Sequence, residues 1–234
     1  SLADVREGMR NHYEGTELSM TNDPGAGVYK VPYRWRPMTF KSEGREYFNE
    51  RAIATQQTGF VIVPQMRNWL PDEIGGILWF GVDDANTAVF TPVYSSTLAV
   101  PECYREGNGD LLTFSWTSAF WIHNWVANMA YNRYEPMIRD IRPVQKELED
   151  SYVDLVKNTD AKALELLKSS PAQATAYLTE VCGKVADEAT ARWKKLGEYL
   201  LVKYMDGNVK KEKDGKFEEN GYGQIVSPNF PGYS

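Results

Sequence analysis

The hydrophobic pattern of residues 49–94 predicts a small antiparallel sheet. It contains four runs rich in β-branched and aromatic residues, separated by glycine or polar turn residues, as is typical of strands. The runs are Arg51–Gln57, Phe60–Met66, Ile77–Val82 and Ala88–Tyr94. Their spacing favours hairpin connections, with a turn at 83–86 between the last two strands. The pair Gly75-Gly76 is expected to reverse the chain with positive φ.

Periodic apolar positions predict helices before and after this sheet. Residues 2–13 have helical spacing, and Ser1 with Asp4 resembles a capping box. A helix that Ser115 caps and that runs to Tyr134 is aromatic on nearly every face, which indicates burial between layers. From Pro136 one apolar face continues, and Pro171 restarts a long amphipathic helix over 172–205, in which Gly183 is expected to weaken or kink the helix.

The remaining segments are predicted to be loops, one hairpin and an arm. Residues 38–40 and 46–48 flank a turn around Ser42-Glu43-Gly44, which predicts a hairpin. Residues 206–234 lack periodicity and are expected to form an extended arm. The fold class is therefore α+β. We divide the chain into a sheet-rich part with an N-terminal helix (1–115), a helical layer (116–205) and the arm (206–234).

Composition narrows the classes of function. The chain of 234 residues is 42% hydrophobic and 25% charged, as in ordinary globular proteins, and its net charge of −6 argues against a nucleic-acid surface. No apolar run approaches the length of a membrane span, about 20 residues. The two cysteines and two histidines have no metal-ligand spacing. We expect neither a metal nor a cofactor.

Nucleophile candidates are few, and each has a structural alternative. Cys182 is expected to pack in the apolar stripe of its helix. Cys103 lies in a polar loop, with no His or Lys nearby to lower its pKa, which favours a structural cysteine over a reactive thiol. Ser1 is interpreted as a helix cap; the alternative is an N-terminal nucleophile whose own amine is the base. His123, inside an aromatic helix, is interpreted as a core residue.

Arginines and aromatic side chains supply candidate binding groups. Arg34 and Arg36 in Tyr-Arg-Trp-Arg-Pro are candidates to bind a substrate carboxylate, against cation–π packing of a surface loop as the alternative. Trp79 is a further candidate for substrate binding. The adjacent Asp83 and Asp84 are interpreted as turn residues rather than ligands of a hard cation.

Several stretches resemble the C-terminal half of the bacterial cysteine dipeptidases of the N-terminal-nucleophile hydrolase group, relatives of penicillin V acylase and bile salt hydrolase. The resemblance spans nearly the whole chain. It rests on Asn-His-Tyr-Glu-Gly-Thr (11–16), Pro-Tyr-Arg-Trp-Arg-Pro (32–37), Glu-Arg-Ala-Ile-Ala-Thr-Gln-Gln-Thr-Gly (50–59), Gly-Gly-Ile-Leu-Trp-Phe-Gly-Val-Asp-Asp (75–84), Ser-Ala-Phe-Trp-Ile-His-Asn-Trp-Val-Ala-Asn (118–128) and Leu-Leu-Val-Lys-Tyr-Met-Asp-Gly-Asn (200–208).

The resemblance implies a metal-free amidohydrolase that cleaves dipeptides, built as an αββα sandwich of two antiparallel sheets between helical layers. Its nucleophile would be a Cys at the mature N-terminus, with the free α-amine as base. This chain departs from that pattern because it begins with Ser1. We therefore expect a C-terminal part, inactive alone, whose partner is the N-terminal half of the same protein. Arg51 is the residue expected to contribute to catalysis.

The resemblance also bears on localisation and oligomeric state, and one other function competes with it. The resemblance implies a periplasmic or secreted enzyme, and a homo-oligomer is compatible with it. The competing hypothesis is a non-catalytic module that binds peptides or glycans through its aromatic residues, namely Trp35, Trp69, Trp79 and Trp121. An exposed apolar sheet face would favour the part of a larger enzyme, since a self-contained module covers such a face.

Overall fold

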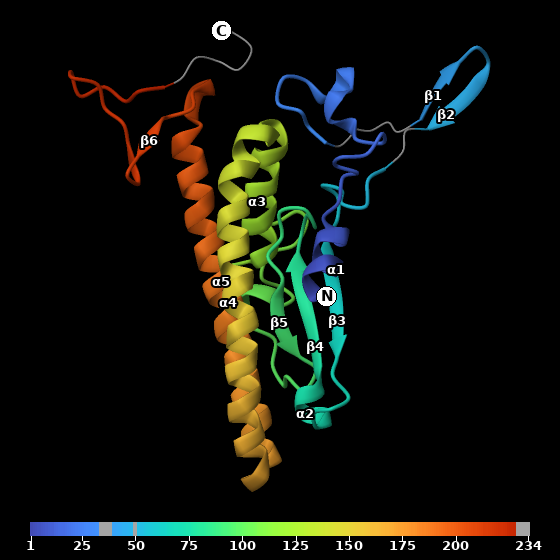
Figure 1. Ribbon diagram of the computed structural model, residues 1–234, viewed down its shortest axis with the longest axis vertical. Coiled ribbons are helices and arrows are strands. Elements are labelled where there is room, and N and C mark those ends of the chain that lie inside the picture. Colours follow the sequence, from blue (N-terminus) through green and yellow to red (C-terminus); the bar gives the residue numbers. More distant parts are fainter. Residues whose placement is uncertain (33–38, 49–50, 228–234) are drawn as a thin grey trace.

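A long pair of helices and a short antiparallel sheet form the body of the molecule (Figure 1). The computed structural model describes residues 1–32, 39–48 and 51–227. In chain order the helices and strands are α1 (Leu2–Met9), β1 (Thr39–Ser42), β2 (Arg45–Phe48), β3 (Phe60–Met66), α2 (Asp72–Gly75), β4 (Gly76–Val82), β5 (Thr91–Tyr94), α3 (Ala119–Asn132), α4 (Tyr134–Ser169), α5 (Pro171–Lys203), β6 (Glu212–Lys213) and β7 (Lys216–Phe217). The α+β prediction is confirmed.

The central sheet has the order β3-β4-β5 with antiparallel pairing throughout. Val63 lies opposite Trp79, and Ile77 lies opposite Tyr94, so these side chains share one face. That inner face is buried under the helices and forms the core. Cys182 of α5 reaches the sheet, because its Sγ accepts a hydrogen bond from the Tyr94 N–H at 3.3 Å.

Three of the four predicted strands are present, and the first is wrong. Residues 51–57 form turns, because the Ala54 N–H donates to the Asn11 carbonyl at 3.0 Å and the Thr58 N–H donates to Thr55. Because these backbone groups are already paired, they do not form the hydrogen bonds that would join this segment to a neighbouring strand. The last strand begins at Thr91 rather than Ala88.

Gly75-Gly76 also differs from the prediction. Neither glycine has positive φ; α2 ends at Gly75 and β4 begins at Gly76. These positions are instead tightly packed. A Cβ on Gly76 would lie 2.6 Å from the Ser95 hydroxyl oxygen, and one on Gly75 would lie 3.1 Å from the Arg67 carbonyl oxygen.

Two helix starts agree with the prediction, and two other helix boundaries differ from it. Ser1 and Asp4 form the predicted capping box, although α1 ends at Met9 instead of residue 13. Ser170 caps α5 by accepting from the Gln173 N–H, and Pro171 occupies the first turn. The Ser115 cap is wrong: α3 begins at Ala119, and the Ser115 hydroxyl donates to the Asn108 side chain instead.

Close contact between α3 and α5 depends on one glycine. A Cβ on Gly197 would lie 2.5 Å from the Trp125 ring, so only glycine allows this approach. At Gly183, by contrast, a Cβ would meet nothing within 4 Å, and α5 runs continuously through this position. In the described part of the chain, no helix is both long and apolar enough to cross a membrane.

Two small hairpins project from the same end of the body (Figure 1). The predicted β1–β2 hairpin is confirmed, and its turn residues Glu43 and Gly44 have φ of 50° and 74°. The C-terminal arm carries the β6–β7 pair, a short ladder within the segment predicted to be extended. The division of the chain at 115/116 and 205/206 stays a prediction.

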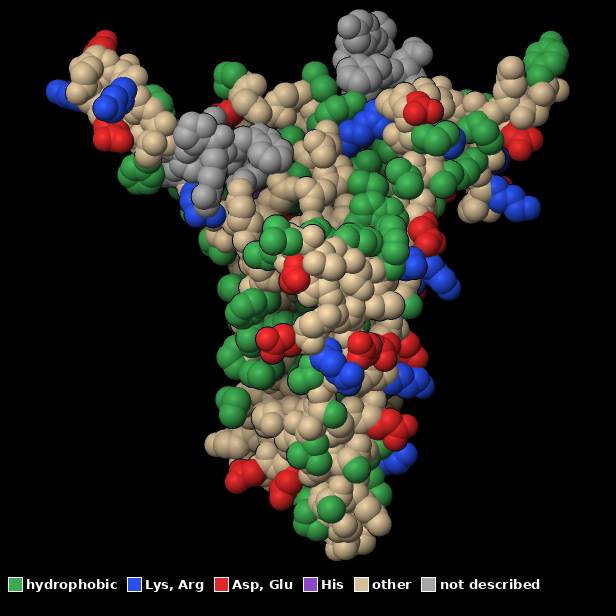
Figure 2. All heavy atoms as spheres, turned by 180° about the vertical axis from the view of Figure 1, so that it is seen from behind, with side chains coloured by type: hydrophobic (Ala, Val, Ile, Leu, Met, Phe, Trp, Pro, Cys, Tyr) green, Lys and Arg blue, Asp and Glu red, His purple; other side chains and the backbone are tan. Residues whose placement is uncertain are grey.

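The outer face of the β3-β4-β5 sheet is apolar, and it is exposed mainly along β3. The segment 97–104 borders one side of it and leaves a hollow of about 460 Å³. Figure 2 shows hydrophobic side chains along the side of the body where the sheet lies. The exposed apolar residues of this face and its border are Phe60, Ile62, Met66, Leu78, Leu98 and Val100. Exposed apolar patches of this kind mark surfaces that interact with other groups.

Candidate functional site

Polar side chains gather at the end of the sheet where β3 begins and β4 ends. The loop 51–58 precedes β3, and the Asp83 N–H just after β4 donates to the Gly59 carbonyl at 2.9 Å. Arg51 is exposed in this loop, and its Nη2 lies 3.4 Å from the Thr55 hydroxyl. The Tyr13 hydroxyl donates to the Arg51 carbonyl at 2.9 Å. These hydrogen bonds to the backbone hold the loop in place, and the Arg51 guanidinium stays accessible to solvent.

Amide side chains link this loop to a buried carboxyl group. Gln56 Nε2 donates to Asn128 Oδ1 at 3.2 Å, and Asn128 Nδ2 donates to Asn124 Oδ1 at 2.7 Å. Asn124 Nδ2 then donates to Asp83 Oδ1 at 3.1 Å. We call Gln56, Asn128, Asn124 and Asp83 the amide relay. It connects the surface loop with the interior through two residues one turn apart on α3.

Asp83 is the unusual member of the amide relay. Its side chain is buried, its φ is 65°, and its Oδ2 has no hydrogen-bond partner. Burial raises the pKa of its carboxyl group to about 7, and the neighbouring Asp84 adds to this increase. A strained backbone and an orphaned buried oxygen both cost free energy, and such costs concentrate at functional sites.

A second cluster of polar side chains surrounds Asp84, the residue after Asp83. Burial raises the pKa of Asp84, whose carboxylate accepts hydrogen bonds from the Thr87 hydroxyl at 2.9 Å and the Tyr131 hydroxyl at 3.0 Å. His12 Nε2 lies 2.9 Å from the same Tyr131 oxygen. Burial opposes ionisation of Glu14, yet its hydrogen bonds with His12 lower its pKa to about 2.

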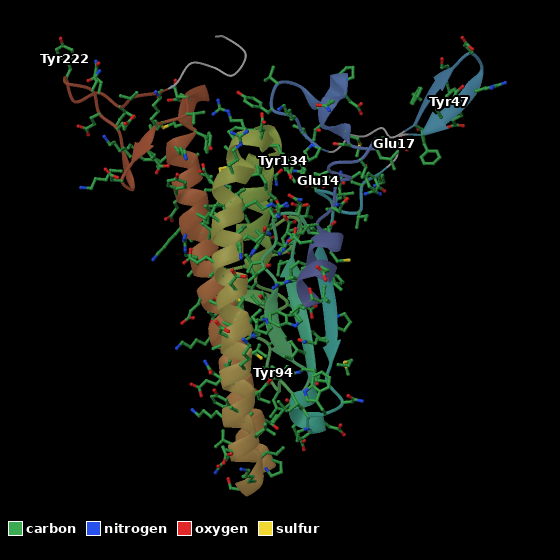
Figure 3. All side chains as sticks on the ribbon, in the orientation of Figure 1. Glu14, Glu17, Tyr47, Tyr94, Tyr134 and Tyr222 are labelled. Carbon is green, nitrogen blue, oxygen red and sulfur yellow. The ribbon has the colours of Figure 1, made fainter. Side chains whose placement is uncertain are left out.

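Figure 3 places Glu14 and Tyr134 close together between the N-terminal segment and the helices. Tyr134 belongs to the same cluster, because its hydroxyl donates to Asn86 Oδ1 at 2.8 Å. The interpretation of residues 83–86 as a turn is correct for the backbone. All four side chains are nevertheless buried, so this turn is part of the core. No group of three His, Cys, Asp or Glu residues suited to a metal occurs among the described residues.

The predicted site residues do not lie in one place. Arg34, Arg36 and Trp35 fall outside the described residues. Trp79 is 1% exposed, and its Nε1–H donates to Gln65 Oε1 at 2.9 Å, so ring and donor are both engaged within the chain. Its role in substrate binding, like that of Arg51 in catalysis, stays a prediction.

The aromatic residues of the competing module hypothesis are likewise dispersed. Trp69 is exposed in the turn after β3, whereas Trp79 is buried on β4. Trp121 lies on α3, where its Nε1–H donates to the Asp110 carbonyl at 3.1 Å. Trp121 lines a hollow of about 520 Å³ under the loop 103–111. Trp69 and Trp79 do not line this hollow.

Neither cysteine has the environment of a nucleophile. Both thiols are buried and free. Burial raises the pKa of Cys103 to about 12, and burial also raises the pKa of Cys182. His123 is a core residue as predicted: burial lowers its pKa to about 4, and its ring stacks on Trp193.

Sequence reasoning missed the amide relay, although one signal was available. Asn124, Asn128 and Asn132 recur every four residues, which places them in a row on a helix. Asn132 Nδ2 indeed donates to the Asn128 carbonyl at 2.7 Å. The burial of Asp83 had no comparable signal, because Asp-Asp-Ala-Asn is typical of an exposed turn.

The raised pKa of Asp83 makes stability depend on pH. The native state holds this proton more tightly than the unfolded state, whose carboxyl has the ordinary value of 3.8. Protonated Asp83 therefore makes its full contribution to the free energy of unfolding below about pH 4. This contribution is lost as the pH rises towards 7. Asp83→Asn keeps an acceptor for Asn124 and is expected to stabilise the fold at pH 8 but not at pH 4.

Urea unfolding at several pH values measures this effect. Asp154→Asn serves as the control, because Asp154 is an exposed carboxylate on α4. An Asp83→Asn variant whose stability follows the wild type in parallel from pH 4 to pH 8 would contradict the assignment.

This chain is similar to known proteins over much of its length. The sequence profile of a family described as Peptidase family C69 matches residues 1–147. "Probable dipeptidase B" of Lactococcus lactis subsp. lactis (strain IL1403) is 25% identical over 205 residues, covering 86% of this chain and 38% of that protein. "Probable dipeptidase" of Latilactobacillus sakei is 26% identical over 193 residues, covering 81% of this chain and 35% of that protein. The chain thus spans little more than a third of the length of these relatives.

Proposed function

Because this chain belongs to peptidase family C69, we propose that it forms part of a dipeptidase, which hydrolyses the amide bond of dipeptides. The observation that carries the proposal is the family match over residues 1–147, which contain Arg51 and the whole amide relay. Two relatives are named as probable dipeptidases, which supports the substrate class.

We place the nucleophile of this dipeptidase outside residues 1–234. Cys103 and Cys182 are buried thiols, and burial raises the pKa of both, which disfavours the nucleophilic thiolate. The Ser1 hydroxyl and amine both bond to Asp4, which occupies them in the capping box. A catalytic Cys with its free α-amine as base, in the remaining length that the relatives have, fits the proposal.

Arg51 is the catalytic contribution that we assign to this chain. One hydrogen bond, to Thr55, is the interaction that its guanidinium makes with described residues, so further donors are available to substrate. A guanidinium close to the reacting carbonyl stabilises the negative charge that develops on its oxygen. The amide relay and Tyr13 act as positioning residues, because they hold the loop that carries Arg51.

The exposed sheet face fits the same proposal. An apolar face of this kind is stable in water when a second layer covers it. We propose that the outer face of β3, β4 and β5 packs against another layer of the same enzyme. The relatives are more than twice as long as this chain, which provides the material for that layer.

Dipeptide hydrolysis by the full-length protein and by residues 1–234, each with and without a thiol-blocking reagent, tests the proposal. We expect the full-length protein to cleave dipeptides, to lose this activity on blocking, and residues 1–234 to be inactive. Activity of residues 1–234 that disappears on blocking would make Cys103 or Cys182 the nucleophile. Activity that survives blocking would point to Ser1. A full-length protein that cleaves no dipeptide would refute the proposed function.

A further inference from the structure

Helices α1 and α4 enclose a cavity of about 370 Å³ that is rich in basic side chains. It shares no residue with the amide relay or with the loop that carries Arg51. The charged residues that line it are Arg6, Arg10, Arg142, Lys146, Glu7, Glu149 and Asp150. Four cations face three anions, which leaves one positive charge in excess.

Arg6 is the residue that makes this cavity unusual. It is 6% exposed, and its Nε and Nη1 have no hydrogen-bond partner. Its Nη1 lies 3.4 Å from Glu149 Oε2, an ion pair without a hydrogen bond, and its guanidinium lies 5.6 Å from the centre of the Trp79 ring. Buried N–H donors of a charged group without acceptors cost free energy. An acceptor in the cavity would remove that cost.

The hydrogen-bond acceptors near Arg6 already bond to other donors of the protein. Glu149 Oε1 accepts from Arg10 Nη2 and from the Phe90 N–H at 2.9 Å. Arg10 also donates to Glu7 at 2.9 Å and to the Ala88 carbonyl at 3.1 Å. Glu149 therefore compensates chiefly Arg10, and Arg6 is left without a hydrogen-bonded counter-charge.

Arg142 of α4 supplies a second guanidinium to the lining of the cavity. Its Nη1 donates to the Asn86 carbonyl at 2.8 Å and to Gln145 Oε1 at 2.7 Å, which fixes the group on α4. Both of these bonds come from Nη1, and the guanidinium also interacts with the Tyr134 hydroxyl. Guanidinium groups bind planar oxyanions through paired N–H donors, and a fixed group loses little entropy on binding.

We propose that the cavity between α1 and α4 is a binding site for a small oxyanion, a free carboxylate or phosphate, held by Arg6 and Arg142. The volume accommodates such an ion, and a monoanion neutralises the excess positive charge. Lys146 at the rim, half of an exposed pair with Asp150, adds attraction at the entrance. The site does not depend on the peptidase chemistry, because none of its residues belongs to the proposed catalytic loop.

Isothermal titration calorimetry of the full-length protein with sodium acetate and with sodium phosphate tests the proposal, with chloride used to match ionic strength. We expect saturable binding of at least one of the two anions. Arg6→Met keeps an apolar side chain against Trp79 and is expected to weaken binding by at least about tenfold, since it removes charge-assisted hydrogen bonds. Arg142→Met is expected to weaken binding as well, and it preserves the test if Arg6→Met does not fold.

Arg105→Met is the matched control, because Arg105 is an exposed arginine paired with Glu102 outside the cavity. It removes the same charge and is expected to bind the anion like the wild type. Binding of acetate alone identifies a carboxylate site, and binding of phosphate alone identifies a phosphate site. Absence of binding by both anions, or equal affinity in the wild type and in both cavity variants, would overturn the proposal.

Discussion

Arg51→Ala in the full-length protein is expected to lower kcat/KM for a dipeptide by about 10²-fold or more, because it removes a donor to the developing oxyanion. The fold should not change. Arg51 is exposed, and its side chain makes one long hydrogen bond, to Thr55. The measurement is steady-state hydrolysis of a dipeptide, with the thermal unfolding midpoint as a check on stability.

Two further variants make the Arg51 experiment specific. Arg51→Lys keeps the charge but not the planar fork, so partial activity is expected. Arg45→Ala removes an exposed arginine of β2 and controls for the general loss of a positive charge. Turnover of Arg51→Ala equal to that of the wild type would remove Arg51 from the active site and leave the role of the loop 51–58 open.

Glu149→Ala is expected to be the most destabilising of the substitutions considered. Its carboxylate is buried between Arg6 and Arg10 and accepts the Phe90 N–H, so its removal leaves two buried guanidinium groups without this partner. Breaking a buried ion pair from one side costs about 3–5 kcal/mol of unfolding free energy. Urea unfolding of wild type and variant at neutral pH measures this loss.

Glu147→Ala on the same helix is the matched control. Its side chain is largely exposed and lies 3.6 Å from Arg192, a surface pair whose contribution is expected to be below about 1 kcal/mol. Glu149→Gln retains an acceptor for Phe90 and should fall between the two. Equal stability of Glu149→Ala and Glu147→Ala would mean that the two arginines find other partners, contrary to the contacts described.

Local signals in the chain were sufficient for the elements that depend on few neighbours. The capping box needs Ser1 and Asp4, three positions apart. The β1–β2 turn has positive φ at 43 and 44, which Gly44 adopts without strain, and the start of α5 needs Ser170 and Pro171. In each case the hydrogen-bond partners are within a few residues. The local sequence is therefore sufficient to predict these caps and this turn.

Tertiary contacts decided what lies in the core and what reaches the site. Residues 51–57 have strand-like composition but form turns, because Asn11 accepts one of their backbone hydrogen bonds. The pair Asp83-Asp84 has turn chemistry, yet helices cover both side chains, and burial raises their pKa. Trp79 has the aromatic character of a binding residue but lies on the inner face of β4.

The two polar sites depend most strongly on the fold. Arg10 and Glu149 are 139 positions apart, and Asn124 and Asp83 are 41 positions apart. Hydrophobic periodicity predicts which helix and which strand carry such residues, but not which of them meet. The α+β class and the peptidase resemblance were thus available from the residue pattern. The amide relay and the basic cavity arise only when burial removes water and leaves their polar groups to find partners within the protein.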